Sequence, residues 1–190
     1  MKPEIRVLGI DDAPFSFSDS NTDIIGVVMR GNNYIEGVLH DSITIDGMDA
    51  TRICENLILK TRHYLQLRAV LLDGATMGGF NVIDIDALGE KTDVPIITIT
   101  RCKPDFERIL AALKDHFIDW EQRFSILKKG VLHKIETSHN PIFVKCAGLS
   151  VSEAKEIITI STIRGVIPEP LRVAHIIASG ISRGESYGKA

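Results

Sequence analysis

The chain has 190 residues, 44% hydrophobic and 25% charged, a composition that fits one globular domain and excludes a disordered or fibrous protein. Its apolar runs are far shorter than the roughly 20 residues of a membrane span, and no signal peptide opens it, so we expect a cytoplasmic protein without a membrane partner. The net charge of −3 argues against indiscriminate nucleic-acid binding. The three cysteines form no C-x-x-C pair, so we expect small buried hydrophobes rather than a zinc site or disulfides.

The charge is divided unevenly along the chain. Residues 1–100 carry 8 basic and 15 acidic side chains, whereas residues 101–190 carry 14 basic and 10 acidic ones. This asymmetry suits an acidic metal site in one half and a phosphate-facing surface in the other. Two ordinary solvated surfaces would give the same counts, so the charges leave both interpretations open.

Apolar runs rich in β-branched residues predict five strands in the first hundred residues. They cover residues 5–10, 23–29, 35–45, 69–72 and 95–100. Gly31-Asn32-Asn33 is a turn signal between the second and third strands, which we therefore expect to form a hairpin.

Helical spacing and capping residues predict five helices. They cover residues 50–66, with Asp49 or Thr51 as its cap, and residues 81–90, 104–117, 150–162 and 168–181. Ser150 and Glu153 fit a capping box, and Pro168 and Pro170 suit a helix start. Residues 131–135 and 142–144 could form two further short strands.

The connections between these elements predict a mixed sheet. The first three strands are joined by short loops and should be antiparallel, whereas strands reached through helices should join in parallel. Helices on both faces complete the expected fold, an α/β single domain over residues 1–190.

Two of the predicted strands end on an acidic residue. Residues 7–10 lead into Asp11, and residues 69–72 lead into Asp73. Carboxyl ends of neighbouring parallel strands share the rim where α/β sheets bind ligands. Two carboxylates meeting there repel each other unless a cation lies between them, and Mg²⁺ or Mn²⁺ suits oxygen ligands. Each Asp could instead simply begin a turn, since Asp73-Gly74 is a common turn dipeptide.

Two other stretches have both a functional and an ordinary interpretation. The glycine-rich segment 74–79 lacks nucleotide-binding spacing, so it is either plain turn chemistry or a place where backbone amides approach a phosphate. The basic stretch Lys128, Lys129, His133 and Lys134 could follow a nucleic-acid backbone or form a solvated loop.

Four stretches in order resemble motifs of the endonuclease V family. Gly9-Ile10-Asp11 resembles its G-V-D, residues 70–74 its V-L-V-D-G, residues 94–101 its L-P-T-I-G-V-A-K, and residues 167–175 its P-E-P-x-R-x-A-H. The chain more closely resembles a group of uncharacterised, largely archaeal proteins distantly related to endonuclease V. This resemblance implies an RNase H-like fold.

The resemblance also implies roles for individual residues. Asp11 and Asp73 take the metal-ligand positions, His175 a further active-site position, and Arg101 the place of a lysine that works near phosphate. The family's glutamate at the end of the third strand has no counterpart here, and Asp46 or Asp49 are the candidates to replace it.

The activity implied is a nuclease or phosphodiesterase that uses Mg²⁺ or Mn²⁺ and acts on DNA or RNA. Two alternatives are a catalytically degenerate module that binds nucleic acid or another partner, and an enzyme acting on a small phosphorylated metabolite. The family's P-Y-I-P wedge is matched only in part by Tyr34-Ile35-Glu36-Gly37, so incision at deaminated bases is not implied. The oligomeric state stays open.

Overall fold

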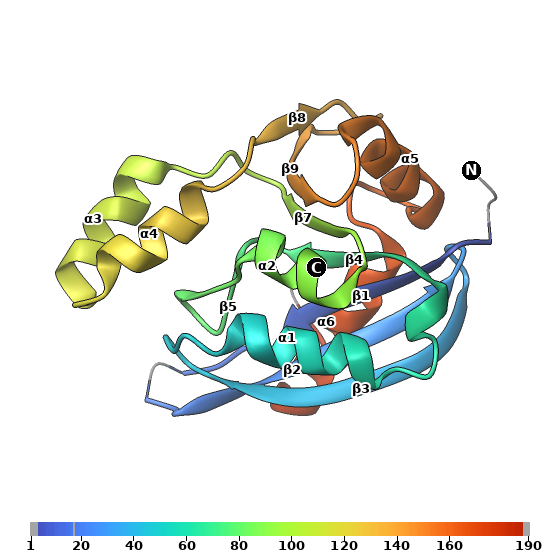
Figure 1. The fold of residues 1–190 in the computed structure, drawn as a ribbon. Coiled ribbons are helices and arrows are strands. Elements are labelled where there is room, and N and C mark those ends of the chain that lie inside the picture. The colour runs from blue at the N-terminus through green and yellow to red at the C-terminus, as the bar shows by residue number, and fades with distance from the viewer. Residues whose placement is uncertain (1–3, 17, 188–190) are drawn as a thin grey trace.

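A computed structural model describes residues 4–16 and 18–187, and its centre is a seven-stranded mixed sheet (Figure 1). The strand order across the sheet is β3-β2-β1-β4-β7-β9-β8. The strands are β1 (Arg6–Asp12), β2 (Asn21–Arg30), β3 (Tyr34–Thr44), β4 (Leu67–Asp73), β7 (Ile96–Thr100), β8 (His133–Ile135) and β9 (Ile142–Ala147). A separate small hairpin, β5 (Thr76–Met77) and β6 (Asn81–Val82), follows β4.

Strand pairing confirms the expected mixed sheet, with one difference. The strands β1, β2 and β3 are antiparallel, and β1, β4 and β7 are parallel. In contrast, β9 is antiparallel to β7, although helices separate the two strands in the chain. The reason is a hairpin: β8 runs in the direction of β7, and the short loop at residues 136–141 turns β9 back between them.

Helices cover both faces of the sheet. Helices α1 (Ala50–Lys60) and α2 (Ile85–Thr92) cover one face, and α5 (Val151–Ser161) and α6 (Glu169–Arg183) cover the other. Helices α3 (Phe106–His116) and α4 (Trp120–Lys128) form an arm that projects from the body, at the left of Figure 1. None of the helices in the described ranges has the length and apolar character that crossing a membrane requires.

Three helix predictions differ from the structure. The helix expected over residues 50–66 ends at Lys60, and a short 3-10 turn, Tyr64–Gln66, follows it. The helix expected from residue 81 begins at Ile85, because residues 81–82 pair with β5. Helix α4 was not predicted, and it includes Lys128 of the basic stretch, for which a solvated loop was one of two interpretations. The apolar side chains of α4 follow no clear helical stripe, so no periodic pattern indicates this helix.

Helix α6 packs unusually close to β1. A Cβ atom at Gly9 would lie 2.4 Å from the carbonyl carbon of Pro170, so only glycine fits at this crossing. Pro168 stands at the N-cap of α6, and Gly184 ends the helix with φ 81°. Gly9 of β1 and Pro170 of α6 therefore lie against each other in one close contact.

The capping box predicted for α5 is present, since Ser150 and Glu153 bond each other's backbone amides. Of the cysteines, Cys54 is buried as expected, whereas Cys102 is exposed, contrary to expectation, because it lies in the bend after β7.

Candidate active site

Asp11 and Asp73 lie next to each other at one rim of the sheet. Strands β1 and β4 are parallel neighbours, and Ile10 lies opposite Leu72, so the two aspartates follow at the same level. Alternation along the strands places both carboxylates on the face covered by α6. Asp11 is 4% exposed, so its carboxylate is almost withdrawn from water. The structure thus brings together two residues that are far apart in the chain.

His175 joins this pair from α6. Its Nδ1 lies 2.9 Å from Oδ2 of Asp11, which fixes the orientation of the imidazole ring. The hydrogen bond to Asp11 raises the pKa of His175, and the charges of Asp11 and Asp73 act in the same direction against its burial. The close crossing of α6 over β1 is what places this histidine above Asp11.

Burial raises the pKa of Asp73 to about 6, and the charge of Asp11 adds to the effect. Arg101, at the end of β7, acts in the opposite direction without cancelling it. The ionised carboxylate is therefore unfavourable where it is buried beside a second acid. A bound cation would relieve that cost.

Asp12 is a further member of this acidic group that the sequence interpretation missed. Its carboxylate accepts a hydrogen bond from the amide of Gly78 at 2.7 Å, on the face opposite to Asp11. Burial raises the pKa of Asp12 to about 6, with Gly78 lowering it and the charge of Asp11 raising it again. The signal was available in the sequence as two consecutive acids at a strand end, and alternation along the strand points the second one to the opposite face.

The residues present fit a divalent cation in part. Asp11 and Asp73 supply the hard oxygen ligands that Mg²⁺ and Mn²⁺ prefer, and Mg²⁺ is commonly bound by one or two carboxylates with water and substrate phosphate. Across residues 4–16 and 18–187, no three His, Cys, Asp or Glu side chains gather closely enough to form a complete metal site. A cation here would need ligands from water or substrate.

The two candidates for the missing glutamate are engaged elsewhere. An oxygen of Asp46 accepts from the amide of Phe80 at 2.8 Å, and its backbone adopts a left-handed φ of 55°. Asp49 stands at the N-cap of α1, but it accepts from Thr44 and from the amide of Asn81 instead of capping the helix. Within the described ranges, no hydrogen bond or ion pair links either acid to Asp11.

A cavity of about 610 Å³ opens beside Asp73, between the rim and the arm. Arg101 and the exposed Lys103 line it together with Asp73. Lys145 also lines it, and its ammonium donates to two carbonyls at the end of α4, each at 2.6 Å. Phe106 presents an aromatic ring to the same space. Its size and its mixture of aromatic and cationic walls suit a nucleotide-sized anion.

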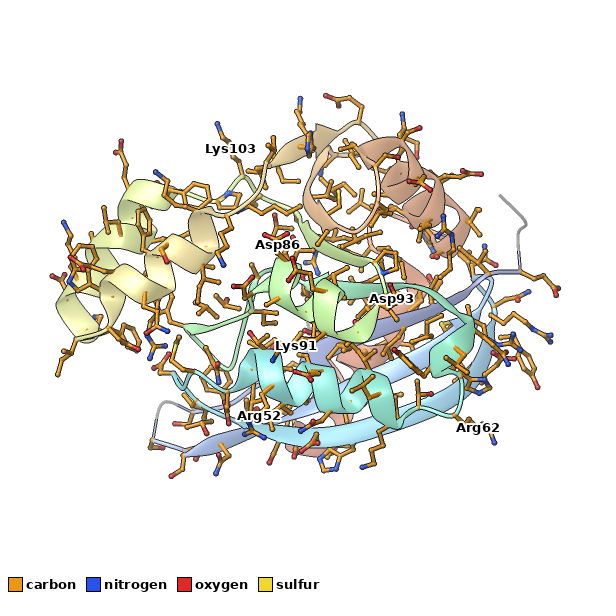
Figure 2. All side chains as sticks on the ribbon, viewed as in Figure 1. Arg52, Arg62, Asp86, Lys91, Asp93 and Lys103 are labelled. Carbon is orange, nitrogen blue, oxygen red and sulfur yellow. The ribbon has the colours of Figure 1, made fainter. Side chains whose placement is uncertain are left out.

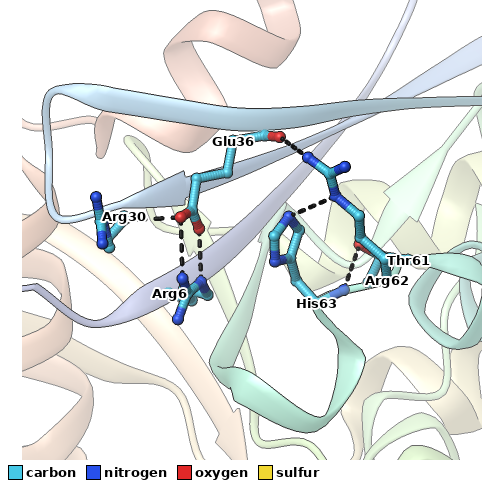
Figure 3. A network of polar contacts seen from close by, with 6 residues as sticks. All are labelled: Arg6, Arg30, Glu36, Thr61, Arg62 and His63. Atoms are coloured by element: carbon cyan, nitrogen blue, oxygen red, sulfur yellow. Dashed lines mark hydrogen bonds and ion pairs between the residues drawn. The ribbon is translucent and has the colours of Figure 1, made fainter.

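The partial wedge motif lies at the opposite end of the sheet from Asp11. Strands β1 and β2 pair Arg6 with Arg30, and the hairpin leading to Glu36 lies at that end. The Glu36 carboxylate accepts from Arg6 at 2.6 and 3.0 Å and lies 3.7 Å from Arg30, as Figure 3 shows. Glu36 therefore links the edge strand β3 to β1 at the end of the sheet that lies away from Asp11.

A family model described as Endonuclease dU matches residues 3–182. The chain belongs to the Endonuclease dU family. A UPF0215 protein of Methanosarcina barkeri is 50% identical, with all of this chain and 97% of that protein covered. A protein of unknown function from Archaeoglobus fulgidus has a solved structure with a TM-score of 0.85 and 36% identity, over 94% of this chain and 98% of that one.

The Endonuclease dU fold is also that of endonuclease V. Ciona intestinalis Endonuclease V, solved with a 24mer DNA containing an inosine, aligns with a TM-score of 0.61 and 14% identity. The alignment covers 90% of this chain and 82% of that chain. Human endonuclease V aligns with a TM-score of 0.60 and 17% identity, over 92% and 83% of the two chains. These similarities confirm the expected RNase H-like fold and the distant relationship to endonuclease V.

Proposed function

We propose that this protein is a divalent-metal-dependent endonuclease that hydrolyses phosphodiester bonds in nucleic acid. The observation that carries the proposal is the buried Asp11 carboxylate, held by His175 at 2.9 Å and adjacent to Asp73 on the neighbouring strand. The family description Endonuclease dU and the fold shared with endonuclease V support the same class of reaction.

Asp11 and Asp73 would hold the cation. When bound, Mg²⁺ or Mn²⁺ supplies Lewis acidity to a phosphoryl oxygen and makes water a better nucleophile. The raised pKa of Asp73 makes its affinity for a cation dependent on pH, because the carboxyl group must lose its proton before it can act as a ligand. Asp46 could join Asp11 and Asp73 as a metal ligand only if its carboxylate gave up the hydrogen bond from the amide of Phe80.

His175 and Arg101 would act on the substrate directly. His175 carries a titratable proton next to Asp11 and would exchange it with water or the leaving oxygen. Arg101 lines the cavity beside Asp73, and its planar guanidinium would hold a non-bridging pair of phosphate oxygens. His175 would therefore act in proton transfer, and Arg101 would position the substrate.

The family description also bears on the substrate. It points to nucleic acid containing deoxyuridine as the substrate. Incision at deaminated bases, which the sequence alone does not imply, is therefore a candidate activity. The argument against such substrates rested on the partial wedge motif around Glu36, which lies at the far end of the sheet from Asp11. A panel of otherwise identical oligonucleotides with uracil, hypoxanthine or only ordinary bases would identify the preferred substrate.

Loss of turnover with retention of binding is the second candidate. It is favoured by the incomplete ligand set, since no three His, Cys, Asp or Glu side chains of the described residues gather closely enough to form a complete metal site. Mn²⁺ binding measured by calorimetry, and cleavage measured on the same preparation, separate the two functions.

The test uses the full chain with Mn²⁺ or Mg²⁺ and labelled single-stranded and duplex DNA and RNA. We expect metal-dependent cleavage that Asp11→Asn and Asp73→Asn both abolish, together with loss of Mn²⁺ binding. Asp93→Asn is the matched control, because Asp93, labelled in Figure 2 at the end of α2, is exposed and asparagine tolerates its left-handed φ of 52°. Mn²⁺ binding without cleavage of any substrate would support the degenerate module instead.

A further inference from the structure

A second cavity opens at the same rim of the sheet, beyond β9. It has a volume of about 460 Å³ and lies between the loop 136–141, α5 and the loop that leads to α6. Phe143 of β9 lies opposite Thr100 of β7, so this loop and the end of β7 share one end of the sheet. Ile135 and Ile158 line the cavity and belong to the core beneath α5, on the face that also carries Asp11.

The lining of this second cavity is positively charged. His139, Lys155 and Arg164 come from three separate segments of the chain and converge on it. The acid among its described lining residues is Glu136, whose carboxylate lies 2.6 Å from the ammonium of Lys134. The C-terminus of α5 adds about half a negative charge, which is less than the two full charges of Lys155 and Arg164.

Three of the hydroxyl groups around the cavity already donate hydrogen bonds within the protein. Thr137, Thr159 and Thr162 each donate to a backbone carbonyl, at 2.8, 2.8 and 2.7 Å. A ligand in the second cavity would therefore be held mainly by electrostatic attraction, and less by hydrogen bonds that could distinguish one base from another. This is the chemistry that recognises a sugar–phosphate backbone and carries no sequence information.

We propose that the second cavity binds a backbone phosphate of the same nucleic-acid strand whose scissile bond lies at Asp11 and Asp73; this inference rests on the proposed endonuclease function. Strand β4, which carries Asp73, and strand β8 are three strand spacings apart, about 14 Å, which is about four nucleotide steps of a stacked strand. Arg101 and Lys103, which projects from the molecule in Figure 2, provide positive charge at the end of β7 along this path.

The experiment compares the double variant Lys155→Gln, Arg164→Gln with the wild-type chain. The matched control is Arg52→Gln, Lys60→Gln, which removes two exposed charges from α1 on the other face. Affinity for a labelled 16-nucleotide single strand is measured by fluorescence anisotropy in EDTA over a range of salt concentrations. We expect about tenfold weaker binding by the first variant and a salt slope shallower by about 0.7, the value for one phosphate of a single strand, with neither effect in the control.

The result is independent of cleavage. Wild-type affinity and salt slope in the Lys155→Gln, Arg164→Gln variant would overturn the inference even if the protein cleaves DNA. Weakened binding in that variant, with no cleavage under any metal, would support the phosphate site in the second cavity and refute the proposed function. A loss confined to binding of a poly-glutamate peptide would overturn it in favour of an acidic protein partner. Arg164→Lys, which keeps the charge and the fold, should bind within about threefold of wild type.

Discussion

Replacing Asp73 by asparagine should stabilise the metal-free protein. Burial and the charge of Asp11 raise the pKa of Asp73 from 3.8 to about 6, so ionising it in the folded state is unfavourable. A shift of about two pKa units corresponds to about 3 kcal/mol, and partial solvent access reduces the expected gain to about 1–2 kcal/mol. For a chain of this size, that gain raises the melting temperature by about 2–8 °C at pH 7.5.

The pH dependence of this gain follows from the direction of the shift. Below about pH 4 Asp73 is protonated in both the folded and the unfolded chain, so the wild type and Asp73→Asn should melt together. The folded chain binds the proton more tightly, so the wild type loses stability as the pH rises from about 4 through the folded pKa of about 6. Above about pH 7 the difference should be constant.

The assay is a series of thermal melts in EDTA from pH 4 to 8, repeated with Mn²⁺. Added Mn²⁺ should raise the melting temperature of the wild type by mass action and leave Asp73→Asn unchanged. Asp93→Asn changes an exposed side chain, so its free energy of unfolding should stay within about 0.5 kcal/mol of that of the wild type at every pH. The reasoning would be refuted if Asp73→Asn were less stable than the wild type at pH 7.5. It would also be refuted if the gain in stability at pH 4 were as large as the gain at pH 7.5.

Three further predictions concern the surroundings of this site. His175→Ala should lower the single-turnover cleavage rate by about 10²–10⁴ with an unchanged circular dichroism spectrum, and a loss below fivefold would exclude a role in proton transfer. Gly9→Ala should cost about 1–3 kcal/mol in urea denaturation, because its Cβ would meet the backbone of Pro170, whereas Gly37→Ala has open space and should cost less than 1 kcal/mol. Lys145→Met should cost about 1–3 kcal/mol and speed hydrogen exchange across α4, because two carbonyls lose their donor; unchanged exchange there would contradict the link.

The sequence predicts the part of the fold that depends on local pattern and connection length. The three antiparallel strands and the parallel order of β1, β4 and β7 follow from short loops and helical crossovers. The meeting of Asp11 and Asp73 then follows once β1 and β4 are parallel neighbours, because both residues stand where a buried strand ends.

The remaining features depend on contacts between distant segments. The left-handed Asp46 is held by the amide of Phe80, 34 residues later, and no spacing in the sequence indicates that bond. The arm is stabilised by aromatic contacts such as Phe80 with Phe117, whose ring centroids are 5.7 Å apart, rather than by an apolar stripe. The prediction that strands reached through helices join in parallel is wrong for β9, because its hairpin with β8 determines its direction.

Asp11 and Asp12 show how one dipeptide connects two structures on opposite faces of the sheet. Because neighbouring side chains of a strand alternate, Asp11 points to His175 on α6, whereas Asp12 points to Gly78 in the β5–β6 hairpin. Gly78 in turn accepts a hydrogen bond from the backbone amide of Asp46 at 2.8 Å, beyond the end of β3. The third-strand acid is therefore connected to the rim through the backbone of Gly78, while its carboxylate serves the turn at Phe80. The acid at the end of the third strand thus has a structural part here, and the negative charge of the rim comes from three aspartates on two strands instead.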